Sequence, residues 1–72
     1  MEEYSRILIE EYCESHHSAR SRRLARLVEM SYDLNVIASD EDAIFLEMVI
    51  EREKNPELRK ALEDLDEFLF GY

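Results

Sequence analysis

The sequence predicts an all-α fold, a small bundle of four short helices, and three observations favour it. Apolar residues recur at helical spacing in four stretches of the chain. Neither of the usual hairpin turns of a β-fold, Asn-Gly or Asp-Gly, occurs in the sequence. A composition of 46% hydrophobic and 38% charged residues, with one Gly and one Pro, is typical of packed helices. We expect residues 1–72 to form a single helical domain.

The first two helices are predicted over residues 3–17 and 18–34. Their apolar stripes are Tyr4, Ile7, Leu8 and Tyr12 in the first, and Leu24, Leu27, Val28 and Tyr32 in the second. Arg6 and Glu10 lie four residues apart and are placed to form an ion pair. The stretch 15–18 contains no Gly or Pro, which leaves two arrangements: a tight bend, which we prefer, or one long helix.

The third and fourth helices have clear start signals. Ser39 is followed three residues later by Asp42, the spacing of a capping box, and the acids of this turn favour a helix start. Asn55 caps the fourth helix, Pro56 suits its first position, and Gly71 can end it. The predicted apolar face of the fourth helix is Leu58, Ala61, Leu62, Leu65, Phe68, Leu69 and Tyr72.

The third helix is apolar on nearly every side, because only Glu47 and Glu51 form a polar strip within residues 43–51. A helix of this kind is normally buried all round, and three other short helices can hardly enclose it. It is either a central core helix or, as we prefer, part of a homodimer interface formed with the fourth helix. The residues expected at that interface are Phe45, Met48, Val49, Leu65 and Phe68.

Charge is distributed unevenly along the chain. The net charge of −9 divides into −2 for residues 1–36 and −7 for residues 37–72. Four neighbouring arginines have no acid four residues before them: Arg20, Arg22, Arg23 and Arg26. They need carboxylates of this chain's own helices, an acidic protein partner, or the phosphates of a nucleic acid. The expected partner-binding residues are Arg22, Arg23, Arg26 and an exposed Met30.

No catalytic or metal-binding residue is predicted. Cys13, His16 and His17, with Glu10 and Glu14 nearby, have spacings that a metal ion can use. A structural zinc site needs four ligands, and only a dimer of this segment would supply them. With one Gly in the chain no phosphate-binding loop can be built, and no nucleophile has a base and an orienting group in place. We therefore expect a protein that is not an enzyme and carries no metal or cofactor.

One part of the chain is similar to a known family. The segments 24–29, 32–34 and 39–45 loosely resemble the middle of the Hha/YmoA family, small helical modulators that act by binding a nucleoid protein. The resemblance covers less than half of the chain, and the acidic second half departs from that family. No functional residue is carried over from it.

The sequence favours a regulatory or adaptor protein that acts by protein–protein binding, as a homodimer, in an inhibitor, antitoxin-like or transcription-modulating role. A single cysteine, an acidic start and short apolar runs favour a cytoplasmic protein without membrane contact. Its small size alone leads us to place it in a prokaryote or virus. The alternative is a nucleic-acid-associated regulator that uses the arginines of residues 20–26. It is less favoured because the net negative charge repels phosphate.

Overall fold

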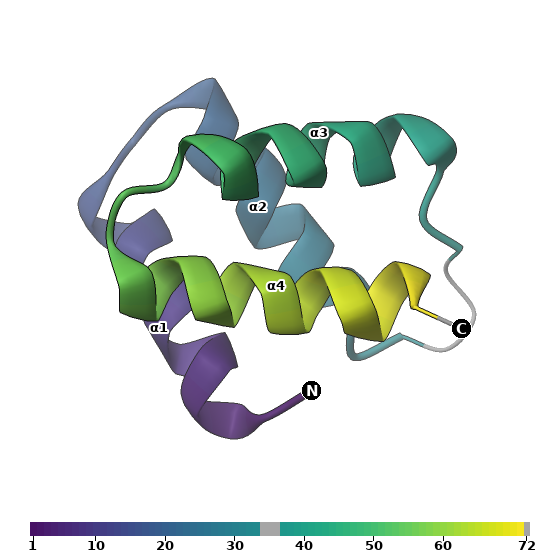
Figure 1. The fold of residues 1–72 in the computed structure, drawn as a ribbon, viewed down its shortest axis with the longest axis horizontal. Helices are drawn as coiled ribbons and strands as arrows, with labels where there is room; N and C mark the ends of the chain where they lie inside the picture. Colours follow the sequence, from purple (N-terminus) through teal and green to yellow (C-terminus); the bar gives the residue numbers. More distant parts are fainter. Residues whose placement is uncertain (34–36, 72) are drawn as a thin grey trace.

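Four helices joined by short connections form the described part of the chain (Figure 1), which comprises residues 1–33 and 37–71 of a computed structural model. The helices are α1 (Glu3–Ser15), α2 (Ala19–Met30), α3 (Asp40–Arg52) and α4 (Pro56–Phe70). No strand occurs among these residues, so the predicted all-α fold is confirmed. The parts of the prediction that concern residues 34–36 and Tyr72 lie outside the described residues. None of the helices seen here has the length and apolar character needed to cross a bilayer.

The helix α4 is the centre of the packing. It lies antiparallel beside α3, while α1 and α2 cross behind this pair (Figure 1). The helix α4 packs on both α1 and α3, and α1 packs on α2. The buried apolar residues form one cluster: Ile9, Leu24, Leu27, Val28, Leu46, Val49, Leu58, Ala61, Leu62 and Leu65. Burial of large apolar side chains of this kind stabilises the fold by about 1.5–3 kcal/mol each.

Side-chain caps set three of the helix starts. Ser39 and Asp42 form the predicted capping box of α3, and the Asn55 side chain accepts hydrogen bonds at the start of α4, as predicted. Ser18 caps α2 with Ser21, a box in which serine replaces the usual Glu or Gln. The helix α1 ends at Ser15 and α2 begins at Ala19, which confirms the bend over residues 15–18.

The core side of α1 differs from the prediction. Ile9 is fully buried and Ser5 is 6% exposed, whereas Tyr4, expected in the apolar stripe, is 62% exposed. Ile7 is also exposed, and only the Leu8 and Tyr12 part of the stripe packs against the core. The stripe was misassigned because a serine stands on the core face four residues before Ile9, where an apolar side chain was expected.

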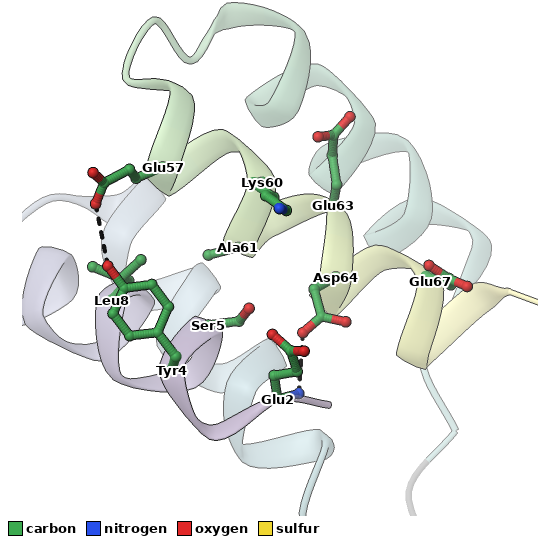
Figure 2. Close-up of a pocket in the computed structure, with 10 residues that line it drawn as sticks. All are labelled: Glu2, Tyr4, Ser5, Leu8, Glu57, Lys60, Ala61, Glu63, Asp64 and Glu67. Atoms are coloured by element: carbon green, nitrogen blue, oxygen red, sulfur yellow. Dashed lines mark hydrogen bonds between the residues drawn. The ribbon is translucent and has the colours of Figure 1, made fainter.

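Polar contacts tie α1 to α4 at two points (Figure 2). The backbone N–H of Glu2 donates to Oδ2 of Asp64 over 3.1 Å. The Tyr4 hydroxyl donates to Oε2 of Glu57 over 3.2 Å. The contact with Glu57, through its charge first and its hydrogen bond second, raises the pKa of Tyr4. These contacts explain why an exposed tyrosine stands at the α1–α4 boundary.

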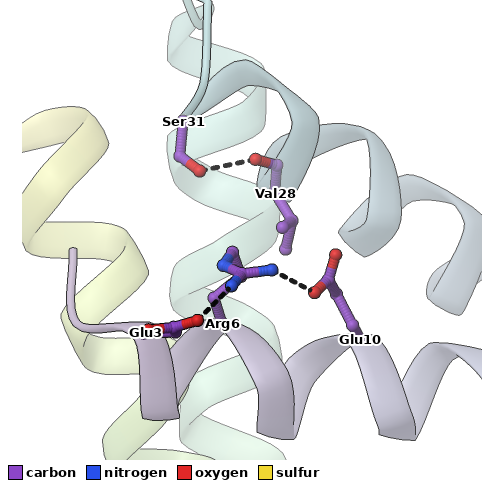
Figure 3. Close-up of polar contacts among 5 residues, drawn as sticks. All are labelled: Glu3, Arg6, Glu10, Val28 and Ser31. Atoms are coloured by element: carbon purple, nitrogen blue, oxygen red, sulfur yellow. Dashed lines mark hydrogen bonds and ion pairs between the residues drawn. The ribbon is translucent and has the colours of Figure 1, made fainter.

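On its other side, α1 faces α2 through Arg6 (Figure 3). The Arg6 guanidinium pairs with Glu10 at 2.8 Å, as predicted, and with Glu3 at 3.2 Å. It also lies over the ring of Tyr32, with 5.5 Å between its Cζ and the ring centroid. Tyr32, predicted in the apolar stripe of the second helix, is therefore an exposed partner of a cation rather than a core residue.

Candidate interaction surface on α2 and α3

The inner edge of α2 is tied to the start of α3 by Arg23. Its Nη2 donates to Oδ1 of Asp42 over 3.2 Å, and its Cζ lies 4.4 Å from the centroid of the Phe45 ring. Burial alone would raise the pKa of Asp42, but hydrogen bonds from Ser39 and from Arg23 outweigh it and hold the pKa below the ordinary value. Arg23, predicted to bind a partner, is thus largely committed to this chain's own fold.

Arg20 lies on the same edge, one turn before Arg23. Its Nη2 lies 3.9 Å from Oε1 of Glu53, which is a loose ion pair. The Nε atoms of both Arg20 and Arg23 are buried and have no hydrogen-bond partner in the described ranges. Each guanidinium therefore has donor capacity beyond its present ion pair.

Arg22 and Arg26 lie on the solvent-exposed side of α2, away from the core. They stand four residues apart on one helical face, and both are exposed. Within residues 1–33 and 37–71, no carboxylate oxygen lies within 4.0 Å of either guanidinium. Of the four clustered arginines, these two keep their charge available to another molecule.

A small apolar hollow of about 120 Å³ lies beside the inner edge of α2. Its lining residues are Arg20, Phe45, Met48, Val49 and Arg52. The hollow places cationic groups next to apolar surface, and Met48 on its rim is 44% exposed. We call the surface made by Arg20, Arg22, Arg26, Phe45, Met48 and Arg52 the arginine face.

The structure divides the residues that the sequence assigned to a dimer interface. Val49 and Leu65 belong to the core of the single chain. Phe45 is half-buried beneath Arg23. Met48 and Phe68 remain exposed, at 44% and 46%. Only these last two present large apolar surface to solvent, and they lie on different helices.

Sequence reasoning missed two members of the exposed surface and misplaced a third. Ile44 is 60% exposed and lies one turn before Met48 on α3, so the expectation that this helix is not fully enclosed is correct. Arg52, interpreted from the sequence only as a cation near a helix end, lines the hollow. Its position four residues after Met48 was the available signal. Met30, expected to be exposed, is half-buried and packs against the core.

The histidine and cysteine segment is organised by local contacts. The His16 ring stacks on Tyr12, with 4.3 Å between ring centroids, and its Nδ1 lies 3.0 Å from the Tyr12 carbonyl oxygen. Burial, and secondarily Glu10, raise the pKa of the half-buried Cys13 thiol, which makes it a weak nucleophile at neutral pH. Among the residues whose structure is described, no three His, Cys, Asp or Glu side chains are grouped so as to hold a metal ion.

Comparisons with protein-family models, with curated proteins and with solved structures gave no match. The partial resemblance to the Hha/YmoA family therefore supports no functional assignment for this chain.

Proposed function

We propose that this protein is a non-enzymatic regulatory or adaptor protein that binds another protein through the arginine face. The observation that carries the proposal is the pair Arg22 and Arg26, exposed and without a carboxylate partner among the described residues. Beside Arg20 on the same helix, the apolar hollow offers a place for one aliphatic side chain. A surface that joins available guanidiniums to an apolar anchor point suits a partner segment with acids around an apolar residue.

Magnitudes show why both parts of the arginine face are needed. Exposed ion pairs contribute about 0–1 kcal/mol each and weaken as salt is added. An aliphatic side chain that leaves water contributes about 1.5–3 kcal/mol. The apolar anchor at Phe45 and Met48 would supply affinity, while Arg22 and Arg26 would select an acidic partner and speed its association.

Homodimerisation is the second element of the proposal. Ile44 and Met48 form an exposed apolar pair on α3, at 60% and 44% exposure, and a second copy that packs on this pair would cover it. This interface lies on α3 alone, because Val49 and Leu65 are already buried in the single chain. Because Met48 also lines the hollow, the dimer and the partner would compete for this side chain.

The same two arginines favour one alternative, a nucleic-acid-associated regulator. Arg22 and Arg26 lie four residues apart on one face of α2, so each can contact a phosphate of the same nucleic acid. The net charge of −9 opposes such binding at long range. Only the local arrangement of cations supports this alternative.

A binding experiment with two ligands tests the proposal. A fluorescein-labelled helical peptide with leucines four residues apart among glutamates, and a labelled DNA duplex, would be titrated with the full chain and followed by anisotropy. The variant Arg22→Ala/Arg26→Ala is expected to weaken peptide binding about tenfold. The control variant Lys54→Ala/Arg59→Ala removes two exposed cations outside the arginine face and should change binding less than about twofold.

The outcomes separate the two candidates. Peptide binding that depends on Arg22 and Arg26 supports the protein-binding function. DNA binding that depends on the same residues, with no binding of the peptide, supports the alternative. Equal losses in the arginine-face variant and the control would show a response to net charge alone and would contradict both. Sedimentation of Ile44→Ser/Met48→Ser beside the unchanged protein tests the dimer, which should dissociate in the variant.

A further inference from the structure

A second surface, unrelated to the arginine face, lies between α1 and α4. It is a groove of about 480 Å³, within the size range of ligand sites in proteins. Five carboxylates line it: Glu2, Glu57, Glu63, Asp64 and Glu67. The only cation among its lining residues is Lys60, so the groove has a local net charge of −4. Figure 2 shows Glu2, Ser5 and Asp64 between the two helices, whereas the Glu63 side chain points away from α1.

The carboxylates of the groove are mostly left without cations. Glu57 accepts one hydrogen bond from the Tyr4 hydroxyl, and Asp64 accepts one from a backbone N–H. For the described chain, no Lys, Arg or His nitrogen lies within 4.0 Å of Glu63 or Glu67. Even Lys60, one turn before Asp64, forms no ion pair within that limit in the same ranges. The groove therefore keeps acceptor capacity for an incoming cation.

An independent observation at this site is the side chain of Ser5. It is 6% exposed, it lines the groove, and it has no hydrogen-bond partner in the residues described. Figure 2 shows the Ser5 hydroxyl turned toward α4 and into the groove. A ligand that entered the groove could therefore donate a hydrogen bond to this oxygen. Its neighbours Leu8 and Ala61 supply the apolar part of the lining.

We propose that this groove binds an arginine-containing basic segment of another protein. An arginine side chain would lie along the groove with its methylene groups against Leu8 and Ala61. Its guanidinium would donate to the carboxylates of Glu63 and Asp64 and to the Ser5 oxygen. Arginine suits this arrangement better than lysine because its planar fork presents five donors at fixed angles, whereas an ammonium group has three.

The charge of the groove favours a basic partner. Its local net charge of −4, together with the −9 of the whole chain, attracts a basic segment and concentrates it there. The described residues also contain no cluster able to hold a metal ion, which removes a bound metal as the occupant of the groove. A basic protein segment is the occupant that agrees with the charge, the apolar lining and the hydroxyl together.

Titration of the full chain with fluorescein-labelled hexa-arginine, followed by anisotropy, tests this proposal. The groove variant Glu63→Gln/Glu67→Gln should weaken binding by about tenfold. Its matched control, Glu41→Gln/Glu51→Gln, removes the same charge from the exposed side of α3 and should weaken binding less than about twofold. The variant Ser5→Ala should weaken binding by about threefold while circular dichroism shows an unchanged fold.

Two further measurements complete the test. Hexalysine should bind more weakly than hexa-arginine, and amide shifts in NMR spectra should change at Ser5, Leu8 and Ala61. Equal losses in the groove variant and in its control, or displacement by spermidine at equal concentration of charge, would overturn the proposal, because the protein would then respond to charge alone. Arg22→Ala/Arg26→Ala should leave hexa-arginine binding intact, so this test can fail or succeed independently of the arginine face.

Discussion

The edge between α2 and α3 and the groove between α1 and α4 use the same carboxylate group with opposite consequences. At the α2–α3 edge, Asp42 accepts hydrogen bonds from Ser39 and Arg23, and its ionised form stabilises the fold. In the groove, Glu63 and Glu67 lie among other carboxylates, and neither forms an ion pair within 4.0 Å among the described residues. Removing a carboxylate should therefore destabilise the protein at the edge and stabilise it in the groove.

The largest effect is expected for Asp42→Ala. The substitution removes half of the α3 capping box, at about 1 kcal/mol, and leaves the partly buried Arg23 without its acid, at about 1–2 kcal/mol more. The free energy of unfolding should fall by about 2–3 kcal/mol in urea titrations. Asp40→Ala removes an exposed acid from the same first turn and should cost less than about 1 kcal/mol. If both variants lost the same free energy of unfolding, Asp42 would stabilise the protein only through its charge near the start of the α3 helix dipole.

Acid should abolish the contribution of Asp42. Its pKa in the folded protein lies below the ordinary value of 3.8, so the folded state holds this proton less readily than the unfolded state. The stability that Asp42 contributes is therefore present in full above the ordinary pKa and is lost as the pH falls through the lower folded-state pKa. Unfolding curves of the unchanged protein and of Asp42→Asn should differ at neutral pH and converge in acid.

A smaller effect distinguishes two neighbouring arginines. Arg23→Ala should lower the free energy of unfolding by about 1–2 kcal/mol, because it removes the ion pair with Asp42 and the contact with the Phe45 ring. Arg22→Ala should change it by less than about 0.5 kcal/mol, since that side chain is exposed. Similar losses for both would show that Arg22 also has a structural role, and would remove it from the arginine face.

The difference between these adjacent arginines also shows which features can be predicted from local sequence and which depend on tertiary packing. Caps, helix order and the α4 core face follow from local signals, and Ser39, Asn55 and Pro56 were assigned correctly from spacing alone. Which side of α2 meets α3 depends on tertiary packing. No local pattern distinguishes Arg23, which pairs with Asp42 nineteen residues away, from Arg22 beside it.

The candidate surfaces were predicted less completely than the fold, for a physical reason. Prediction from amphipathic patterns assumes that core positions are apolar. Because the buried Ser5 is polar, the wrong face of α1 was predicted to pack on the core, and the groove was not predicted. The acids Glu2 and Glu57 are far apart in sequence and line the same groove only because α1 packs on α4. Single-sequence periodicity contains no information about that contact.

In the groove, removal of carboxylates should make the folded protein more stable. Glu63 and Glu67 lie four residues apart, and both are near the C-terminal half of α4, where the helix dipole disfavours anions. Glu63→Gln/Glu67→Gln should raise the free energy of unfolding by about 0.5–1 kcal/mol at low salt. The gain should shrink in 1 M salt, because screening weakens interactions between exposed charges. A loss of stability would mean that these carboxylates have a cationic partner within the protein.

The smallest effect is expected at Asp66, on the side of α4 that faces α3. It tests whether burial alone can make an ionised carboxylate destabilise the fold. Burial, and then the charge of Glu47, raise the pKa of Asp66, so the folded state holds this proton more readily than the unfolded state. Ionised Asp66 therefore costs stability at neutral pH, and that cost disappears as the pH falls through the raised folded-state pKa. Asp66→Asn should stabilise the protein by up to about 0.5 kcal/mol at pH 7 in urea titrations, with the gain vanishing in acid. Glu47→Gln should reduce the gain only in part, because burial is the larger cause; removal of the whole gain would assign the effect to the neighbouring charge instead.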